Sequence, residues 1–383
     1  MLNFGMTKDI FFSDFYEKKP FIKRGGYISK SIGWDEVDKC LYIAESIGAN
    51  LRVHKNGFVE DSAYMEVCSE LGSVKNKLIK INLAQLLGAG ASIIYNRMEI
   101  SSLEIRSLCN QVSRFSGAEA VANGYISFGD KETFGNHWDT HDVFAVQLLG
   151  RKRWLVYEPT FPLPLPGQTS LNCKGDCPSE PVIDEILEAG DILYIPRGWW
   201  HTAVPLDEET FHVAIGTHPP KIIDYINWIS KNSLPDLLSC RTSIRLDDFS
   251  ADSMKNVVGD LVSLMLDASN IRNFQESAVR NERFSSDFDI SRNFRKNSLS
   301  EVNNGIYSLN SKFRGNLIKS AATVNGVFVK QEPLVKSIIE MLADSEGSIS
   351  FDNFCLSNEK YSKQEVRIAI DDLLHRDIVQ KVN

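Results

Sequence analysis

Two residues two positions apart are candidates for binding a metal ion. His137 and Asp139 open the stretch HWDTHDVFAVQLLGRKRW, which continues into an apolar run. In an extended strand, side chains at i and i+2 point to the same face, so the imidazole and the carboxylate would converge there. With a further histidine they would form a facial triad, which leaves metal positions open and suits a non-haem Fe(II) oxygenase. The alternative is a surface pair or an internal hydrogen bond.

His201 is the candidate for the third ligand. It ends the segment AGDILYIPRGWWH, which predicts a turn, a buried strand over 192–195 and a second turn. We interpret Trp199 and Trp200, and Trp138 beside the first ligand, as walls that keep water from the metal. Ordinary core packing is the alternative for these tryptophans. The two ligand motifs together are far more specific than either one alone.

Three other histidines lie near these motifs. His141 shares the predicted strand face of Asp139, and we expect it to act beside the metal or toward the substrate rather than as a ligand. His212 and His218 fall on or near a later predicted strand and are interpreted as ordinary core or edge residues.

The composition is that of a globular protein with an acidic balance. The chain has 383 residues, enough for two or three domains, of which 43% are hydrophobic and 24% charged. Lys and Arg number 42 against 50 Asp and Glu, a net charge of −8, and residues 327–383 alone carry 7 against 10, a net charge of −3. Because proteins that grip phosphate backbones are usually basic, this balance argues against direct nucleic-acid binding.

Cysteine usage and hydropathy predict a cytoplasmic protein. The seven cysteines are an odd and scattered set, which indicates reduced thiols rather than a disulfide framework. Cys173 and Cys177 are the one close pair, and no second pair with zinc-site spacing accompanies them. The N-terminus lacks the apolar core of a signal peptide, and no apolar run reaches the ~18–20 residues of a membrane span.

Four regions separate along the chain by their patterns. Residues 1–90 mix short apolar segments with helical stretches. Residues 91–220 contain short β-type runs such as SIIYNRM and FHVAIGTH between turn residues, which predicts an antiparallel sandwich or barrel. Apolar residues at helical spacing predict helices in 221–304, and residues 305–383 predict a small α/β module.

These motifs resemble the JmjC-type, cupin-fold oxygenases that depend on Fe(II) and 2-oxoglutarate, and most closely their ribosomal-oxygenase group. The stretches HWDTHDVFAVQLLGRKRWLVYEP and AGDILYIPRGWWHTA carry the resemblance, which extends over residues 13–220. It implies a mainly β plus α fold, with a double-stranded β-helix (jelly-roll or cupin) core over 91–220 and an N-terminal α/β part. From order and size, it also implies a helical dimerisation segment over 221–304 and a winged-helix-like domain over 305–383.

The resemblance implies that Fe(II) is bound by His137, Asp139 and His201, and that Lys152 pairs with the far carboxylate of the cosubstrate 2-oxoglutarate. The alternation of side chains along a strand supports the same role for Lys152. Arg151 and Arg153 point to one face, and Lys152 points to the other, into the barrel. A buried lysine needs an anion. An internal Asp or Glu is the alternative to the dicarboxylate.

Further cosubstrate contacts follow from the same resemblance. Asn123 and Tyr125 match positions whose side chains hydrogen-bond 2-oxoglutarate, and Ser127 stands where related sequences often have Thr or Ser. On the strand FHVAIGTH the family often has a serine, and here that place is Gly216, next to Thr217. Thr217 is therefore the candidate contact from that strand, and the departure at Gly216 leaves this contact open.

We expect an Fe(II)-, 2-oxoglutarate- and O2-dependent dioxygenase that hydroxylates a C–H bond of a protein or peptide side chain and releases succinate and CO2. A ribosomal protein or a precursor peptide is the candidate partner, and a homodimer is expected because most symmetric oligomers are two-fold. The same chemistry on a small molecule or a biosynthetic precursor peptide is one alternative. A non-catalytic cupin that binds or regulates is another, and the intact metal and lysine motifs disfavour it.

Overall fold

The structure, a computed structural model, describes residues 1–28, 32–47, 51–130, 132, 134–284, 286, 288, 302–303, 305–330, 332–345 and 347–382. The chain divides into two compact units, Met1–His218 and Pro219–Asn383. Residue 304, at the predicted boundary before the last region, lies outside the described residues.

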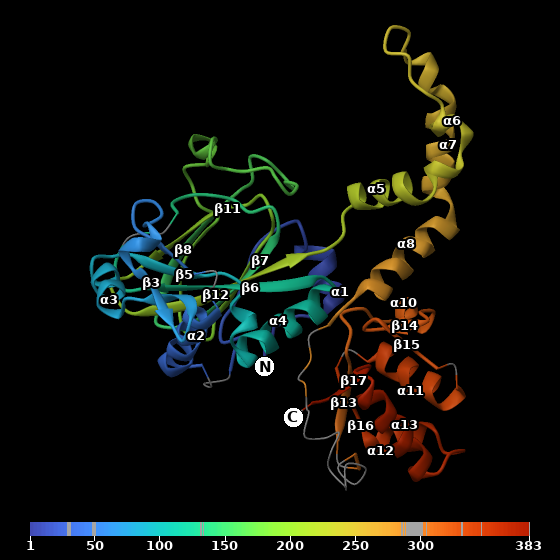
Figure 1. Cartoon of the computed structure of the whole chain (residues 1–383). Coiled ribbons are helices and arrows are strands. Elements are labelled where there is room, and N and C mark those ends of the chain that lie inside the picture. The colour runs from blue at the N-terminus through green and yellow to red at the C-terminus, as the bar shows by residue number, and fades with distance from the viewer. Residues whose placement is uncertain are drawn as a thin grey trace. The chain divides into compact units, whose positions relative to one another are not determined.

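A seven-stranded antiparallel sheet forms the centre of the first unit (Figure 1). Its strands, in spatial order, are β1 (Phe21–Lys23), β10 (Ile192–Ile195), β7 (Asp142–Leu149), β12 (Thr210–His218), β6 (Glu119–Ser127), β5 (Ser92–Tyr95) and β2 (Leu51–His54). A second antiparallel sheet contains β11 (Trp200–Pro205), β8 (Lys152–Tyr157) and β9 (Ile183–Leu187). This mixed α/β unit with a large antiparallel sheet is consistent with the predicted cupin-type core.

Strand β7 is apolar along most of its length because both of its faces are covered. Phe144 and Val146 point into the main hydrophobic cluster on the outer face of the large sheet. Val143 and Ala145 point the other way, into a smaller cluster that they share with Trp154 of β8. A strand buried on both faces has a continuous hydrophobic sequence rather than an alternating one.

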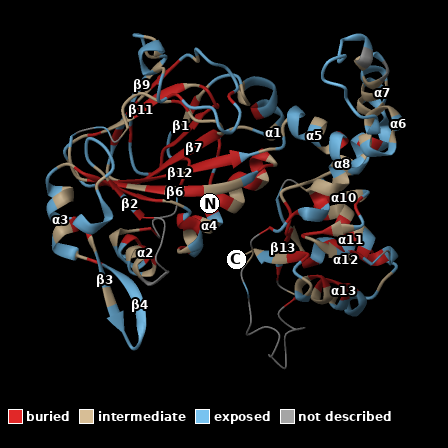
Figure 2. Cartoon of the chain, turned by 45° about the horizontal axis from the view of Figure 1, so that its top comes forward, coloured by how far each residue is buried: buried red, intermediate tan, exposed pale blue. Residues whose placement is uncertain are grey.

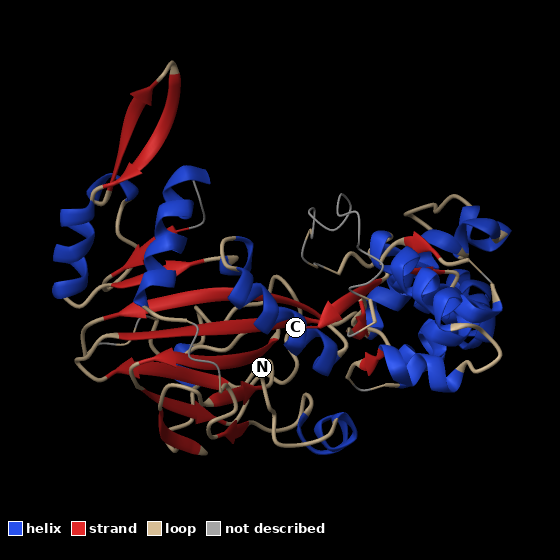
Figure 3. Ribbon diagram, turned by 90° about the horizontal axis from the view of Figure 1, so that it is seen from below, coloured by secondary structure: helices blue, strands red, loops and turns tan. Residues whose placement is uncertain are grey.

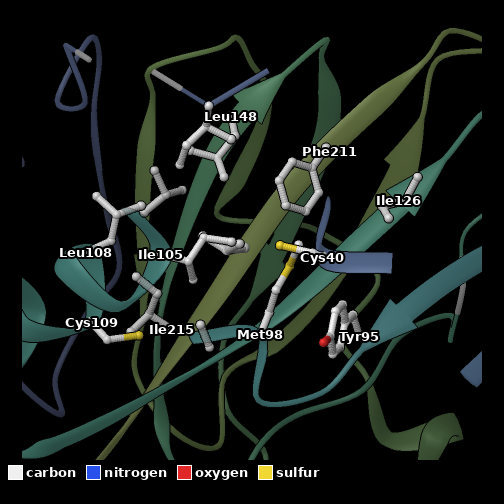
Figure 4. Close-up of a cluster of buried hydrophobic side chains, with 14 of the residues drawn as sticks. Cys40, Tyr95, Met98, Ile105, Leu108, Cys109, Ile126, Leu148, Phe211 and Ile215 are labelled. Carbon is white, nitrogen blue, oxygen red and sulfur yellow. The ribbon is translucent and has the colours of Figure 1, made fainter. Parts of the chain in front are cut away.

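Helix α4 (Leu103–Ser116) covers the outer face of the large sheet. Ser102 caps its start by accepting a hydrogen bond from Ile105 N, and Gly117 ends it at a φ of +68°. Its buried side chains enter the main cluster, and Figure 4 shows Ile105 and Leu108 there beside Phe211 of β12. The helix therefore seals the face of the sheet that lies away from β8.

The other elements of the first unit lie outside the two sheets. β3 and β4 form a largely exposed hairpin that projects from the unit (Figures 2 and 3). These elements are α1 (Lys8–Ile10), the π-helix η1 (Phe11–Phe15), α2 (Trp34–Ile47), η2 (Asp61–Ala63), β3 (Met65–Glu70), β4 (Ser73–Leu78), α3 (Lys80–Gly88), η3 (Met98–Ile100) and η4 (Lys174–Asp176).

The strand predicted through the first metal motif begins later than expected. β7 starts at Asp142, whereas residues 138–141 are irregular and His137 takes part only in an isolated bridge with His201. The expectation that 137–141 form a regular strand was therefore wrong. The physical reason is that this segment exchanges its backbone hydrogen bonds with the turn and strand around His201 rather than with a neighbouring strand over several residues.

The second unit contains helices followed by a small mixed module. Its helices are α5 (Ile222–Asn232), η5 (Leu234–Asp236), α6 (Leu238–Arg241), η6 (Asp252–Met254), α7 (Lys255–Leu266), α8 (Ala268–Asn281), α10 (Asn316–Lys319), α11 (Pro333–Asp344), α12 (Phe351–Ser357) and α13 (Lys363–His375). Its strands are β13 (Ile306–Leu309), β14 (Thr323–Val324), β15 (Val327–Phe328), β16 (Ile349–Ser350) and β17 (Val379–Val382). Ser362 and Glu365 form the capping box that opens α13.

A single hydrophobic cluster holds the C-terminal module together. Ile338 of α11, Leu373 of α13 and Tyr307 of β13 are fully buried in it. Among the described residues, no helix is both long enough and apolar enough to cross a bilayer.

We expect Phe211→Ala to destabilise the first unit strongly. Its ring is fully buried between α4 and the large sheet, and truncating such a ring costs about 3–5 kcal/mol. Thermal unfolding followed by tryptophan fluorescence would measure this, because five of the six tryptophans lie in Met1–His218. Leu103→Ala, at an exposed position, is the control and should change stability by less than about 0.5 kcal/mol; equal effects of the two changes would contradict the packing described.

Candidate active site

His137 and His201 are held opposite each other by their own backbones. His201 N donates to His137 O over 2.8 Å, and His137 N donates to His201 O over 3.1 Å. This reciprocal pair is an isolated antiparallel bridge, and it brings the two imidazole centroids to 4.3 Å. Two residues that are far apart in the sequence therefore present their rings side by side without a long ladder of strand pairing.

Asp139 completes a three-residue cluster. One ligand atom from each of His137, Asp139 and His201 lies within 4.8 Å of the others, and Asp139 Oδ2 is 3.5 Å from His201 Nε2. Gly198 N donates to Asp139 O over 3.0 Å. Gly198 has a φ of +84°, and a Cβ there would lie 2.6 Å from the Phe161 carbonyl oxygen, so only glycine fits this turn.

The hydrogen bonds of the two imidazoles leave one nitrogen of each ring free for a ligand. Nδ1 of His137 is 3.0 Å from Gly135 O, and Nδ1 of His201 is 3.0 Å from Trp199 O. A carbonyl oxygen only accepts, so each Nδ1 carries the hydrogen and each Nε2 keeps its lone pair. Backbone carbonyls that orient histidines in this way are typical of metal-ligating histidines.

The electrostatics of the cluster also fit a divalent cation. Burial, with a contribution from His201, lowers the pKa of His137 to about 4, so its ring is neutral near pH 7. Burial alone would raise the pKa of Asp139, but its contacts with the adjacent His201 and His137 hold it well below its usual range. Two neutral imidazoles and one carboxylate are the donor set that Fe(II) takes in facial-triad sites.

A buried carboxylate ties the two ligand-bearing segments together. Asp142 accepts from Arg197 N over 3.0 Å and from the Tyr194 hydroxyl over 2.6 Å. The Arg197 guanidinium in turn pairs with Glu17 at 2.8 Å and donates to Pro164 O over 3.0 Å. The loop that carries His201 is therefore anchored to the start of β7 and to the N-terminal segment at once.

A cavity of about 440 Å³ opens beside the cluster, and Lys152 lines it. Lys152 is fully buried; its Nζ donates to Ser127 Oγ over 3.2 Å and lies 3.3 Å from His212 Nδ1. Burial lowers the pKa of Lys152 to about 7. Among the described residues no carboxylate forms an ion pair with it, so the structure supplies no internal anion of the kind left open by the sequence.

One more polar group in this cavity, on Trp154, lacks a hydrogen-bond partner, and a tyrosine hydroxyl lies nearby. Trp154 Nε1 is buried and has no hydrogen-bond partner, and its ring lies 5.2 Å from His212, centroid to centroid. The Tyr125 ring stacks on His212 at 4.9 Å, and burial raises the pKa of its hydroxyl. An anionic ligand with several oxygens would pair with the lysine and could accept from these donors, so the residues present fit a dicarboxylate.

Not all of the residues predicted to contact the cosubstrate lie in the cavity. Asn123 lies on the same face of β6 as Tyr125 but does not line the cavity, and its Oδ1 accepts from Arg97 N. Thr217 points to the opposite face of β12 from His212, where it is buried and donates to Asp142 O over 3.4 Å. The structure therefore brings Lys152 and Ser127 together and places Asn123 and Thr217 outside the cavity lining.

The absence of a side chain at Gly216 leaves room for the ring of His141. A Cβ on Gly216 would lie 2.5 Å from His141 Cδ2, so a serine there would collide with the imidazole. His141 lies 4.8 Å from His218, ring to ring, and is not part of the three-residue metal cluster. The departure from the family pattern at position 216 thus has a local cause, which is the space that His141 needs.

Several cavity residues were missed by reasoning from the sequence. His212 was interpreted as an ordinary core or edge residue, yet it contacts Lys152, and its position between apolar Phe211 and Val213 was the available signal. The outer lining comes from distant segments and includes His54, Phe58, Phe134, Leu171 and Lys174. No spacing in the sequence relates these five, because loops bring them together.

Lys152→Met should stabilise the ligand-free protein below neutral pH. The folded pKa of Lys152 is about 7 and its unfolded value is about 10.4, so between these values the unfolded chain binds more protons. The free energy of unfolding of the native protein should therefore rise from about pH 7 to pH 10 and that rise should weaken in the variant. At about 1.4 kcal/mol per pKa unit, the gain below pH 7 is on the order of a few kcal/mol.

Denaturant unfolding across pH 6–10 would measure this difference. Arg151→Met is the matched control, because Arg151 is exposed and pairs with Glu208 at the surface. Identical pH profiles for Lys152→Met and the native protein would show that the lysine is not held in a desolvated site.

Comparisons with known proteins show what this chain resembles. Residues 96–225 match the model of the JmjC domain. The bifunctional lysine-specific demethylase and histidyl-hydroxylase NO66 of Drosophila yakuba is 28% identical over 229 residues, which cover 58% of this chain and 32% of that protein. The NO66 protein of Drosophila erecta is 30% identical over 51% of this chain and 29% of its own length. The chain thus spans about a third of the length of these relatives.

A solved structure shares the fold along the whole chain. The X-ray structure of Escherichia coli YcfD is 17% identical with a TM-score of 0.58, and the match covers 100% of both chains. A structure of the same protein, described as a ribosomal oxygenase in complex with cobalt and 2-oxoglutarate, matches with a TM-score of 0.57. At this identity the likeness shows the fold. Residues 96–225 therefore match the JmjC domain, and the structural likeness shows that the fold is shared along the chain.

Proposed function

We propose that this protein is an Fe(II)- and 2-oxoglutarate-dependent dioxygenase that hydroxylates a protein or peptide side chain. The observation that carries the proposal is the pairing of two features in one cavity. A cluster of two histidines and one carboxylate lies at its wall, and a buried lysine without an anionic partner lines the same space. The relatives named as a hydroxylase and a ribosomal oxygenase support the same activity.

His137, Asp139 and His201 would hold Fe(II), and Lys152 would hold 2-oxoglutarate. When bound, Fe(II) and 2-oxoglutarate with O2 supply the oxidising chemistry: the 2-oxo acid becomes succinate and CO2, and one oxygen atom enters a C–H bond of the substrate. Lys152 would neutralise the far carboxylate, with Ser127 keeping the ammonium in place through its hydroxyl. The chain's contribution is therefore to hold the ligands in register and to exclude water.

Aromatic residues enclose the cavity both around Lys152 and beside the metal cluster. His212 accepts at Nδ1 from Lys152 and is kept neutral, because burial and the neighbouring charge lower its pKa well below its ordinary value. Trp154 and Tyr125 enclose the ring of His212 on two sides. Trp138, which is buried and stacks on Phe161 at 5.7 Å, forms a wall beside the metal cluster. Desolvation of this kind strengthens every charge interaction inside the cavity.

The second unit is proposed to organise the enzyme rather than to react. We keep the division into a helical dimerisation segment over 221–304 and a winged-helix-like domain over 305–383. Partly exposed apolar side chains on α7, including Val258 and Val262, support a homodimer. The acidic balance of the chain supports a protein or peptide partner, such as a ribosomal protein or a precursor peptide, over nucleic acid, and the scattered cysteines support a cytoplasmic location.

Asp139→Ala should abolish conversion of 2-oxoglutarate to succinate. Removing the carboxylate leaves two imidazoles, which bind Fe(II) too weakly to retain it. Purified protein with Fe(II), O2 and 2-oxoglutarate would be assayed for succinate by mass spectrometry. Asp184→Ala, which removes an exposed carboxylate paired with Arg153, is the control and should keep native turnover. If the native protein neither binds iron nor forms succinate, the proposed activity is refuted.

Lys152→Ala should raise the 2-oxoglutarate concentration needed for half-maximal turnover much more than it changes iron affinity. Losing a buried ammonium from a charge pair costs on the order of 2–5 kcal/mol, or at least about thirtyfold in affinity. Iron affinity, measured by titration without cosubstrate, should change by less than about threefold, because Lys152 is not in the metal cluster. A larger change in iron affinity than in the 2-oxoglutarate requirement would show that the cosubstrate is anchored elsewhere. Arg151→Ala, at the exposed neighbouring position, is the control and should change neither.

A further inference from the structure

Four residues behind the metal cluster are joined by a closed set of hydrogen bonds. We call them the anchor network and define it by Glu17, Asp142, Tyr194 and Arg197. Glu17 N donates to the Tyr194 hydroxyl over 3.1 Å, and that hydroxyl donates to Asp142 Oδ2 over 2.6 Å. Arg197 N donates to Asp142 Oδ1 over 3.0 Å, and Arg197 Nε donates to Glu17 Oε1 over 2.9 Å. The network therefore joins the N-terminal segment, β10, the start of β7 and the loop before His201.

Two members of the anchor network lie on the segments that carry the metal ligands. Asp142 follows Asp139 by three residues, and Arg197 precedes His201 by four. The three-residue metal cluster contains neither of them. The network can therefore act on a bound metal only by fixing the backbone that presents the ligands.

The Arg197 guanidinium also holds the loop between β8 and β9. Its Nη1 donates to Pro164 O over 3.0 Å. Farther along this loop, Ser170 Oγ accepts from Trp138 N over 3.2 Å, and Trp138 stands between the first two metal ligands in the sequence. One guanidinium is thus connected to both sides of the metal cluster, to the His201 side through its own chain and to the other side through this loop.

The anchor network is costly to the stability of the fold. Asp142 is 2% exposed and Arg197 8%, so a carboxylate and a guanidinium have both lost their hydration. Glu17 has a φ of +54°, a left-handed conformation that is unfavourable for a residue with a side chain. Apolar residues of similar volume are often as stable as buried charges or more so. Stability alone therefore does not account for the network, whereas a need for fixed geometry does.

We propose that Glu17, Tyr194 and Arg197 are positioning residues of the metal site. By holding Asp142 and the His201 loop in one register, they keep the three ligands preorganised for Fe(II). Without one of these bonds the loop would take several positions, and the metal would have to order its ligands at the expense of affinity. This inference rests on the metal site of the proposed function and adds the N-terminal segment to it.

Titration of the metal-free, full-length protein with Co(II) alone tests the proposal, because bound Co(II) absorbs visible light and its spectrum reports the coordination geometry. Tyr194→Phe removes one hydroxyl and keeps the ring. It should weaken Co(II) binding on the order of tenfold, as for other groups that orient metal ligands, and should shift the absorption bands. Glu17→Ala, which removes the acceptor of Arg197, should do the same, and Glu17→Gln, which keeps an acceptor, should restore most of the affinity.

Tyr64→Phe is the matched control. Tyr64 is fully buried in the same unit, as Tyr194 is, and its hydroxyl also donates to a carboxylate, that of Asp61. Both changes should lower the denaturant concentration at the midpoint of unfolding, because each removes a hydrogen bond to a charged group. Tyr64→Phe should nevertheless bind Co(II) with native affinity and spectrum, which separates the positioning of ligands from stability in general.

Each outcome decides the inference. Native Co(II) affinity and spectrum in Tyr194→Phe and Glu17→Ala overturn it, and so does an equal loss of affinity in Tyr64→Phe. If Tyr194→Phe does not fold, the comparison of Glu17→Ala with Glu17→Gln decides, because the Glu17 side chain is 26% exposed and easier to replace. Failure of the native protein to bind Co(II) removes the metal site of the proposed function, and this inference with it.

Discussion

The bridge between the backbones of His137 and His201 is the constraint on which the site depends. Two hydrogen bonds pair residues that come from segments far apart in the sequence, and the pairing alone sets the imidazoles side by side. Every other interaction around it preserves that register. Gly198 turns the loop tightly enough to donate to the Asp139 carbonyl, and Asp142 holds the same loop by the Arg197 amide. A metal ion would then meet ligands that are already in place.

The cavity carries a second constraint, which is electrostatic. Lys152 is buried with a hydroxyl and a neutral imidazole as its partners, so the free protein is less stable than it would be with an apolar side chain there. Binding of a dicarboxylate would pair this ammonium with an anion and so remove the cost of burying it. Part of the affinity for the cosubstrate would therefore come from the lower stability of the empty site. Because Asp139 is the one carboxylate among the described lining residues, the cavity as a whole favours anions and neutral groups.

The sequence motifs predicted the residues of this site more accurately than they predicted its secondary structure. The positions of His137, Asp139 and His201 led to a common cluster, although residues 138–141 are not the regular strand that the i, i+2 argument assumed. The two residues point together because the isolated bridge and the bond from Gly198 shape an irregular segment. For Lys152 the alternation argument applied directly, because β8 is a regular strand in which inward and outward side chains do alternate.

The sequence by itself determined the antiparallel β core, which two histidines and one aspartate lie together, and the inward direction of Lys152, because local periodicity and residue type encode burial along a regular strand. It could not place Thr217, which β12 turns toward Asp142, nor identify His212 as the neighbour of the lysine. Those outcomes depend on the register between strands. Only the tertiary structure could assemble His54, Phe134 and Lys174 into one lining, because loops are positioned by the packing of the sheets that they connect and leave no periodic trace in the sequence.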